Sequence, residues 1–215
     1  MATAATDTAE AQVDSPTSTR NRSDARQEQL LDIAVRLFAR KGYEGTSLRD
    51  IAEEARITKA ALYYHFPNKE ALYERIVLES MQNLVDTVSA AMARAPSPAD
   101  RVREFMLASA DFLDRSRDSW MAGSNAFWSN SEARPRAVTV HLRDAYERLL
   151  RDSIRDAIAQ GQFRPVDPAM AGRMLLSMLN HLCRWHSLGG RLSTREVIGQ
   201  YLDMTFAGLN APSSK

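Results

Sequence analysis

The sequence contains a single cysteine, Cys183, among 215 residues. One cysteine cannot close an internal disulfide, and thiolate metal clusters need several, so we expect neither. Long apolar runs are also missing, because no segment approaches the roughly 18 uncharged apolar residues of a membrane span. The first residues lack the basic flank and apolar stretch of a secretory signal. These absences lead us to expect a cytoplasmic protein that makes no membrane contact.

An excess of charge of either sign is missing as well. The 28 basic and 27 acidic residues give a formal net charge of +1. A nucleic-acid binder needs a locally basic footprint rather than a basic chain, so the net charge neither supports nor excludes DNA as a partner. The apolar fraction of 44% is enough for a packed core, and 26% charged residues suit a soluble surface.

The sequence also lacks the patterns of β-strands: no run alternates Val, Ile and Thr, and no Asn-Gly or Asp-Gly hairpin turn occurs. Apolar residues recur at three and four instead, which predicts an all-α fold. We expect about nine helices, at residues 26–41, 48–55, 59–65, 69–93, 99–115, 119–130, 136–160, 168–187 and 194–209.

Three regions are expected along the chain. Residues 1–22 are predicted to form a disordered arm, because residues 1–19 are rich in Ala, Thr, Ser and Asp and lack aromatics. Residues 23–70 are predicted to form a three-helix head, and residues 71–210 a helical body for ligand binding and dimerisation.

The head has the pattern of a helix-turn-helix, in which two short helices joined by a tight turn pack on a longer first helix. Ser47, Thr58 and Asn68 are good N-cap residues for the second, third and fourth helices. In this motif the second helix of the pair enters the major groove of DNA. That helix is expected at residues 59–65.

Several side chains of the head suit DNA recognition. Lys59 can reach guanine acceptors or phosphate, and the small Ala60 allows close approach to a base edge. Tyrosine and histidine side chains can donate to phosphates, and free N–H groups at helix starts attract phosphate. Leu62 and Phe66 fall on the inward face. The expected DNA-binding residues are Thr46, Ser47, Thr58, Lys59, Ala60, Tyr63, Tyr64, His65 and Lys69.

Two runs within the head resemble the DNA-binding domain of the TetR family of transcriptional regulators. They are Ala34-x-x-Leu37-Phe38-x-x-x-Gly42-Tyr43-x-Gly45-Thr46-Ser47-Leu48-x-x-Ile51-Ala52 and Ile57-Thr58-Lys59-x-x-Leu62-Tyr63-Tyr64-His65-Phe66-Pro67-x-Lys69-Glu70-x-Leu72. The family commonly has a glycine at the position of Ala60 or Ala61, and this departure affects the expected operator sequence. The resemblance implies a homodimeric repressor that binds a palindromic double-stranded operator and is released when a small-molecule effector moves the fourth helix.

The resemblance also implies that the last two helices, residues about 169–187 and 194–209, pair across the two-fold axis of the homodimer. The first of them is apolar on more than one face, which suits one face for the core and another for a partner.

An aromatic cluster in the body suits a ligand pocket, although aromatics at helical spacing also fill ordinary cores. The expected ligand-binding residues are Phe105, Trp120, Asn125, Phe127, Trp128, Met178 and Arg184. The tail from Asn180 to Leu209 resembles repressors of lipid and steroid catabolism, some of which respond to acyl-coenzyme A thioesters. That resemblance implies an anionic effector whose phosphates Arg184 or Arg191 can meet. The effector itself stays unidentified.

Signs of catalysis are missing. No serine sits in a nucleophile-elbow pattern, no glycine-rich phosphate loop occurs, and the four histidines lack metal-ligand spacing. We therefore expect a protein that is not an enzyme and has no cofactor and no metal site. Two alternatives stay open, an activator of transcription and a DNA-binding regulator controlled by a protein partner.

Overall fold

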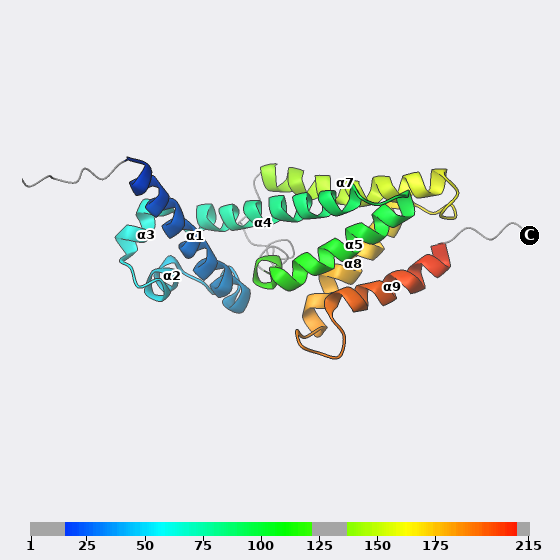
Figure 1. The fold of residues 1–215 in the computed structure, drawn as a ribbon. Coiled ribbons are helices and arrows are strands. Elements are labelled where there is room, and N and C mark those ends of the chain that lie inside the picture. The colour runs from blue at the N-terminus through cyan, green and yellow to red at the C-terminus, as the bar shows by residue number, and fades with distance from the viewer. Residues whose placement is uncertain (1–15, 122–136, 210–215) are drawn as a thin grey trace, which may run out of the picture.

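The computed structural model describes residues 16–121 and 137–209, and these residues contain eight helices, a further helical turn at residues 117–121 and no β-strand. The all-α fold with an N-terminal helix-turn-helix head and a larger helical body is therefore confirmed (Figure 1). The helices are α1 (Pro16–Lys41), α2 (Leu48–Glu54), α3 (Lys59–His65), α4 (Lys69–Met92), α5 (Pro98–Arg115), α7 (Ala137–Ala159), α8 (Pro168–Trp185) and α9 (Thr194–Leu209).

The first helix begins earlier than the sequence predicts. α1 starts at Pro16 rather than at about Arg26, so the expected disordered arm through residue 22 is wrong for residues 16–22. Proline is favoured in the first turn of a helix, and no glycine or further proline interrupts the chain before Gly42. The predicted helix at 119–130 is helical where the structure describes it, at residues 117–121.

Side chains at the helix ends follow the predicted capping chemistry. Ser47, Thr58 and Asn68 each accept a hydrogen bond from the backbone N–H three residues on. Gly42 ends α1 with φ +74°, a left-handed conformation that favours glycine. The caps mark the starts of α2, α3 and α4, as the sequence predicts.

Two apolar cores hold the chain together. The head core joins α1, α2, α3 and the first turns of α4, and the body core joins the remainder of α4 to α5, α7, α8 and α9. Met81 of α4 packs against both cores. Figure 1 shows α4 leaving the head and running along the body, so one continuous helix connects the two units.

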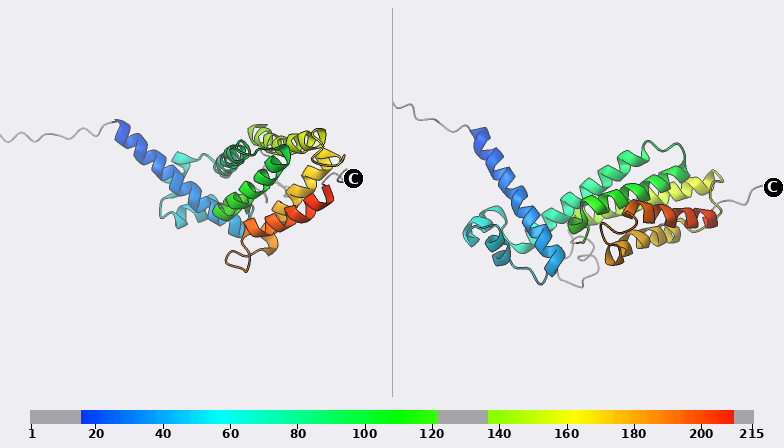
Figure 2. Two further views of the ribbon diagram at one scale, coloured as in Figure 1. Left: turned by 45° about the vertical axis from the view of Figure 1, so that its right-hand side comes forward. Right: turned by 60° about the horizontal axis from the view of Figure 1, so that its bottom comes forward.

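α5 is the central helix of the body. It packs against α4 and α7 on one side and against α8 and α9 on the other (Figure 2). Its apolar residues point inward, and Phe105 is fully buried with its ring 4.5 Å from that of Tyr146. The Tyr146 hydroxyl lies 2.7 Å from Ser109 Oγ, so this polar pair is satisfied inside the core. Burial raises the pKa of Tyr146, which keeps the phenol neutral.

Candidate functional site

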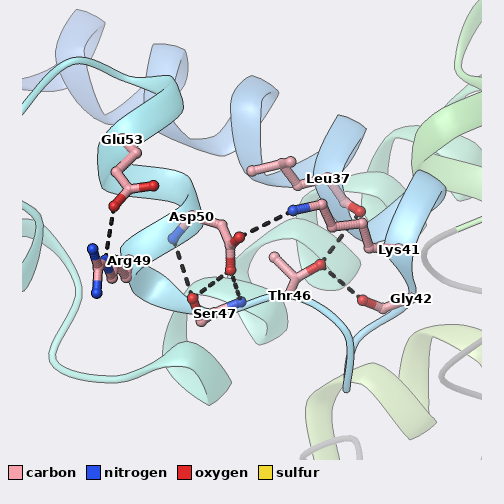
Figure 3. Close-up of polar contacts among 8 residues, drawn as sticks. All are labelled: Leu37, Lys41, Gly42, Thr46, Ser47, Arg49, Asp50 and Glu53. Atoms are coloured by element: carbon pink, nitrogen blue, oxygen red, sulfur yellow. Dashed lines mark hydrogen bonds and ion pairs between the residues drawn. The ribbon is translucent and has the colours of Figure 1, made fainter.

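The second helix of the head is held by a reciprocal cap. Ser47 Oγ accepts a hydrogen bond from the Asp50 N–H at 3.1 Å, and Asp50 Oδ2 accepts one from the Ser47 N–H at 2.8 Å (Figure 3). Asp50 Oδ1 also accepts from Lys41 Nζ at 3.0 Å, which ties the cap to the end of α1. The hydroxyl and backbone hydrogen bonds from Ser47, together with Lys41, hold the pKa of Asp50 well below its usual range. This arrangement is a capping box, and the prediction of Ser47 as the N-cap of this helix is confirmed.

Thr46 lies inside the head. Its side chain is only 1% exposed, and its Oγ1 donates towards the carbonyls of Gly42 at 2.8 Å and Leu37 at 3.3 Å (Figure 3). The Thr46 N–H donates to the Tyr43 carbonyl at 3.2 Å. This corrects the expectation of a phosphate contact by Thr46, because both of its donors are used to close the loop between α1 and α2.

The turn between α2 and α3 contains the one non-glycine residue with positive φ in the described part of the chain, Arg56 at 53°. The Arg56 N–H donates to the Glu53 carbonyl at 3.1 Å, and the Ile57 N–H donates to the Ala52 carbonyl at 3.0 Å. This pair of hydrogen bonds is a Schellman motif, which normally has glycine at the left-handed position. The turn connects α2 to α3. The sequence has no glycine at this position, so the usual sequence signal of such a turn is absent.

α3 has a buried face and an exposed face. Leu62 is fully buried and Phe66 is 6% exposed, so the inward positions are confirmed. Lys59, Ala60 and Tyr63 lie on the outside together with Tyr64, whose side chain is 83% exposed. A large aromatic exposed to this degree gains nothing from the core, which suits a role in contact with a partner.

Three further polar residues of the head, Thr58, His65 and Arg49, have different surroundings. Thr58 Oγ1 accepts from the Ala61 N–H at 3.2 Å, so Thr58 first serves as the cap of α3. His65 is half-buried beside the Tyr64 ring, with the ring centroids 5.3 Å apart. Arg49 is exposed and pairs with Glu53 one turn away at 2.7 Å, which is the solvated arrangement expected of a surface charge.

Lys69 starts α4 and contacts the head from within. Its Nζ donates to the Tyr43 carbonyl at 3.0 Å and lies 4.1 Å from the centre of the Tyr43 ring. Tyr43 in turn packs against the rings of Phe38 and Tyr73 at 5.7 and 4.8 Å. The Lys69 ammonium has three donors, so a phosphate contact stays a prediction beside this structural role.

The expected ligand-binding residues of the body have different positions. Phe105 and Trp120 are buried, Met178 is half-buried on α8, and Arg184 is exposed near the end of α8. Asn125, Phe127 and Trp128 lie outside the described residues. The structure therefore places Phe105 and Trp120 in the body core and leaves Arg184 at the surface.

One residue that the sequence reasoning missed, Arg117, lies where α5 is followed by the next helical turn. Its Nη2 donates to the carbonyls of Cys183 at 2.9 Å and His186 at 2.6 Å, at the end of α8. The buried His186 holds the following loop through a 2.7 Å contact between its Nε2 and the Leu192 carbonyl. Only the fold brings residue 117 to residues 183–186, so no local pattern could have indicated this contact.

No helix in the described ranges is both long and apolar enough to cross a membrane. Among the same residues, no group of three or more His, Cys, Asp or Glu side chains is placed to hold a metal ion.

The head and body together define a class, the helix-turn-helix transcriptional regulators with an all-helical C-terminal body. Comparison with known families agrees. The model described as "Bacterial regulatory proteins, tetR family" matches residues 30–76, and "Tetracyclin repressor-like, C-terminal domain" matches residues 95–209. The chain therefore belongs to the TetR family of transcriptional regulators, which confirms the resemblance seen in the sequence.

Individual relatives extend over nearly the whole chain. The HTH-type transcriptional repressor KstR2 of Mycolicibacterium smegmatis is 27% identical over 187 residues, covering 86% of this chain and 91% of that protein. The structure of the TetR family regulator PfmR from Thermus thermophilus has a TM-score of 0.76 and 35% identity, covering 86% and 98% of the two chains. A structure of AibR in complex with isovaleryl coenzyme A and operator DNA has a TM-score of 0.74 and 30% identity, covering 83% and 97%.

Proposed function

We propose that this protein is a cytoplasmic homodimeric repressor, which binds a palindromic operator through α3 and is released by a small-molecule effector. The observation that carries the proposal is the exposed face of α3. Lys59, Ala60, Tyr63 and Tyr64 form it, while the opposite residues Leu62 and Phe66 anchor the helix in the head core. Such a helix can enter the major groove without disturbing the fold of the head.

The proposed DNA-binding surface extends beyond α3. The starts of α2 and α4, at Ser47 and Lys69, border the same helix-turn-helix and can supply phosphate contacts. Thr58 and His65 lie at the two ends of α3, where they can position the helix on the DNA backbone. Lys59 and Ala60, in the first turn, are the candidates for reading base edges.

Unpaired apolar side chains on α8 and α9 support the homodimer. On α8, Met170 is 59%, Met174 43% and Trp185 55% exposed, and on α9 Met204 is 66% exposed. The α8 residues recur at helical spacing on a face opposite to the buried Leu175 and Leu179. α8 and α9 lie side by side on one flank of the body (Figure 2), so a second copy can cover both in a four-helix arrangement.

An acyl-coenzyme A thioester is the proposed effector class. AibR was solved with isovaleryl coenzyme A and operator DNA, and KstR2 of Mycobacterium tuberculosis is described as a ketosteroid transcriptional regulator. Phe105 and Trp120 lie in the apolar core of the body, and Arg184 is exposed on α8, where its guanidinium can donate to phosphates. In free-energy terms the effector must prefer the state that does not bind DNA, with a coupling of typically about 1–3 kcal/mol.

The test uses the full-length protein and DNA from its own promoter region. Light scattering is expected to give a dimer, and electrophoretic mobility shifts are expected to show salt-dependent binding that an acyl-coenzyme A thioester reverses. A monomer would contradict the dimer, and absence of promoter binding would contradict the repressor. If every thioester left promoter binding intact and a protein from the host abolished it, control by a protein partner would be favoured instead.

A further inference from the structure

The contact between Arg117 and the end of α8 leaves part of the guanidinium unused. Nη2 serves the carbonyls of Cys183 and His186, but Nη1 is buried and has no hydrogen-bond partner among the described residues. No described carboxylate forms an ion pair with Arg117. Leaving a buried cationic donor unpaired is costly, so such a group is expected to have an acceptor in the working state of the protein.

A second unused donor lies one turn along the same helix. The side chain of Trp120 is 9% exposed, and its Nε1 is buried with no partner in the described part of the chain. Residues 117–121 are helical, and the Trp120 N–H donates to the Ser116 carbonyl at 2.9 Å. Side chains three residues apart lie on the same face of a helix, so Arg117 and Trp120 leave this helical turn on the same side.

The surroundings of these donors are apolar on one side and polar on the other. The Trp120 ring lies 6.5 Å from the ring of Phe112, which is 6% exposed. Arg117, by contrast, lies beside the backbone carbonyls of Cys183 and His186, and its Nη2 donates to both of them. A ligand with an apolar body and an oxygen head group matches this pattern: the body packs beside the aromatic rings and the oxygen accepts from both donors.

We infer that Arg117 Nη1 and Trp120 Nε1 together bind a hydrogen-bond-accepting oxygen of the effector, a carboxylate or a thioester carbonyl. This inference rests on the proposed ligand-responsive function and names two residues that recognise the ligand. Because Arg117 also holds the end of α8, an oxygen bound there acts directly on one of the two proposed dimer helices.

The experiment compares three ligands of one chain length: the acyl-coenzyme A thioester, the free carboxylate and the alkylamine, whose ammonium carries donors only. Titration calorimetry on the full-length dimer is expected to give binding of the thioester, the carboxylate or both, and at least tenfold weaker binding of the amine. One oxygen ligand offers a thioester carbonyl and the other a free carboxylate. Their relative affinities therefore show which of the two oxygens the Arg117 and Trp120 donors bind. An amine that binds as tightly as both oxygen ligands would overturn the inference.

Two variants locate the contact, with Arg115→Gln as the matched control because Arg115 is exposed two residues before Arg117. Trp120→Phe keeps an aromatic ring but removes the indole N–H together with part of the ring volume, and Arg117→Gln removes the charge. Each is expected to weaken the oxygen ligand about tenfold, which corresponds to one charge-assisted hydrogen bond. The control is expected to bind within twofold of wild type. Equal affinity in Trp120→Phe and wild type would overturn the inference while leaving the proposed function intact.

A spectroscopic readout separates recognition from a merely structural role. The chain has three tryptophans, so nitrogen-15 labelling gives three indole N–H signals, and the one missing in Trp120→Phe belongs to Trp120. The ligand is expected to move that signal downfield, as a new acceptor does. An unshifted Trp120 signal in the saturated complex would contradict the inference. If none of the three ligands binds or releases DNA, both the inference and the proposed effector class fail.

Discussion

Replacing Thr46 by valine separates a structural role from a DNA contact. Valine has nearly the same shape, but it removes the hydroxyl that donates to the Gly42 and Leu37 carbonyls in a side chain 1% exposed. A lost neutral hydrogen bond together with an underused buried carbonyl costs about 1–2 kcal/mol of unfolding free energy. The DNA interface keeps its charges, so the salt dependence of operator binding is expected to stay unchanged.

Urea unfolding followed by circular dichroism gives the stability, and fluorescence anisotropy with labelled operator at several salt concentrations gives the binding slope. Lys59→Ala serves as the opposite case, because Lys59 is exposed. It is expected to change stability by less than about 0.5 kcal/mol. The loss of its positive charge at the DNA is expected to lower the salt slope by about 1 for each copy in the dimer. If Thr46→Val left stability unchanged and lowered the salt slope, the buried placement of Thr46 would be refuted.

Three further changes test the head. Arg56→Gly is expected to stabilise it by about 1 kcal/mol, because glycine relieves the left-handed backbone at φ 53°, whereas Arg56→Ala is not expected to raise the melting temperature. Gly45→Ala is expected to cost about 3 kcal/mol in urea unfolding, since its new Cβ would lie 2.3 Å from the Lys41 carbonyl oxygen; a cost near zero would contradict the close approach. Because the folded pKa of Asp50 is lowered, its contribution to stability is present above about pH 4 and is lost as the pH falls below that value. Asp50→Asn is expected to remove this part of the acid dependence of the unfolding midpoint, and an unchanged acid dependence would argue against the cap.

Local sequence signals were enough to predict the short helices and their caps. Ser47, Thr58 and Asn68 act through hydrogen bonds to backbone groups three residues away, so their chemistry is readable without the fold. The apolar spacing likewise predicted the inward positions of Leu62 and Phe66, because a helix presents the same face every three to four residues. The start of α1 was missed, since its first turns have polar residues without apolar periodicity.

Most of the parts that could not be predicted depend on contacts between distant segments. Thr46 lies at a helix start, which suggests a phosphate site, yet its burial depends on how α1 approaches α2. Lys69 reaches the carbonyl of Tyr43, 26 residues earlier, and Arg117 reaches residues 66 and 69 positions later. Arg56 adopts a backbone conformation that its residue type disfavours, so the sequence points away from the turn that the structure contains.

The central claim is that two copies of α3 read one palindrome together. The most direct measurement is the affinity of the wild-type protein for its promoter palindrome, beside the same DNA with about half a helical turn, ~5 base pairs, inserted between the half-sites. Binding to the native spacing is expected to weaken steeply with salt, and the insertion is expected to weaken it at least a hundredfold. Equal affinity for the two DNAs, with no dependence on salt, would contradict the account.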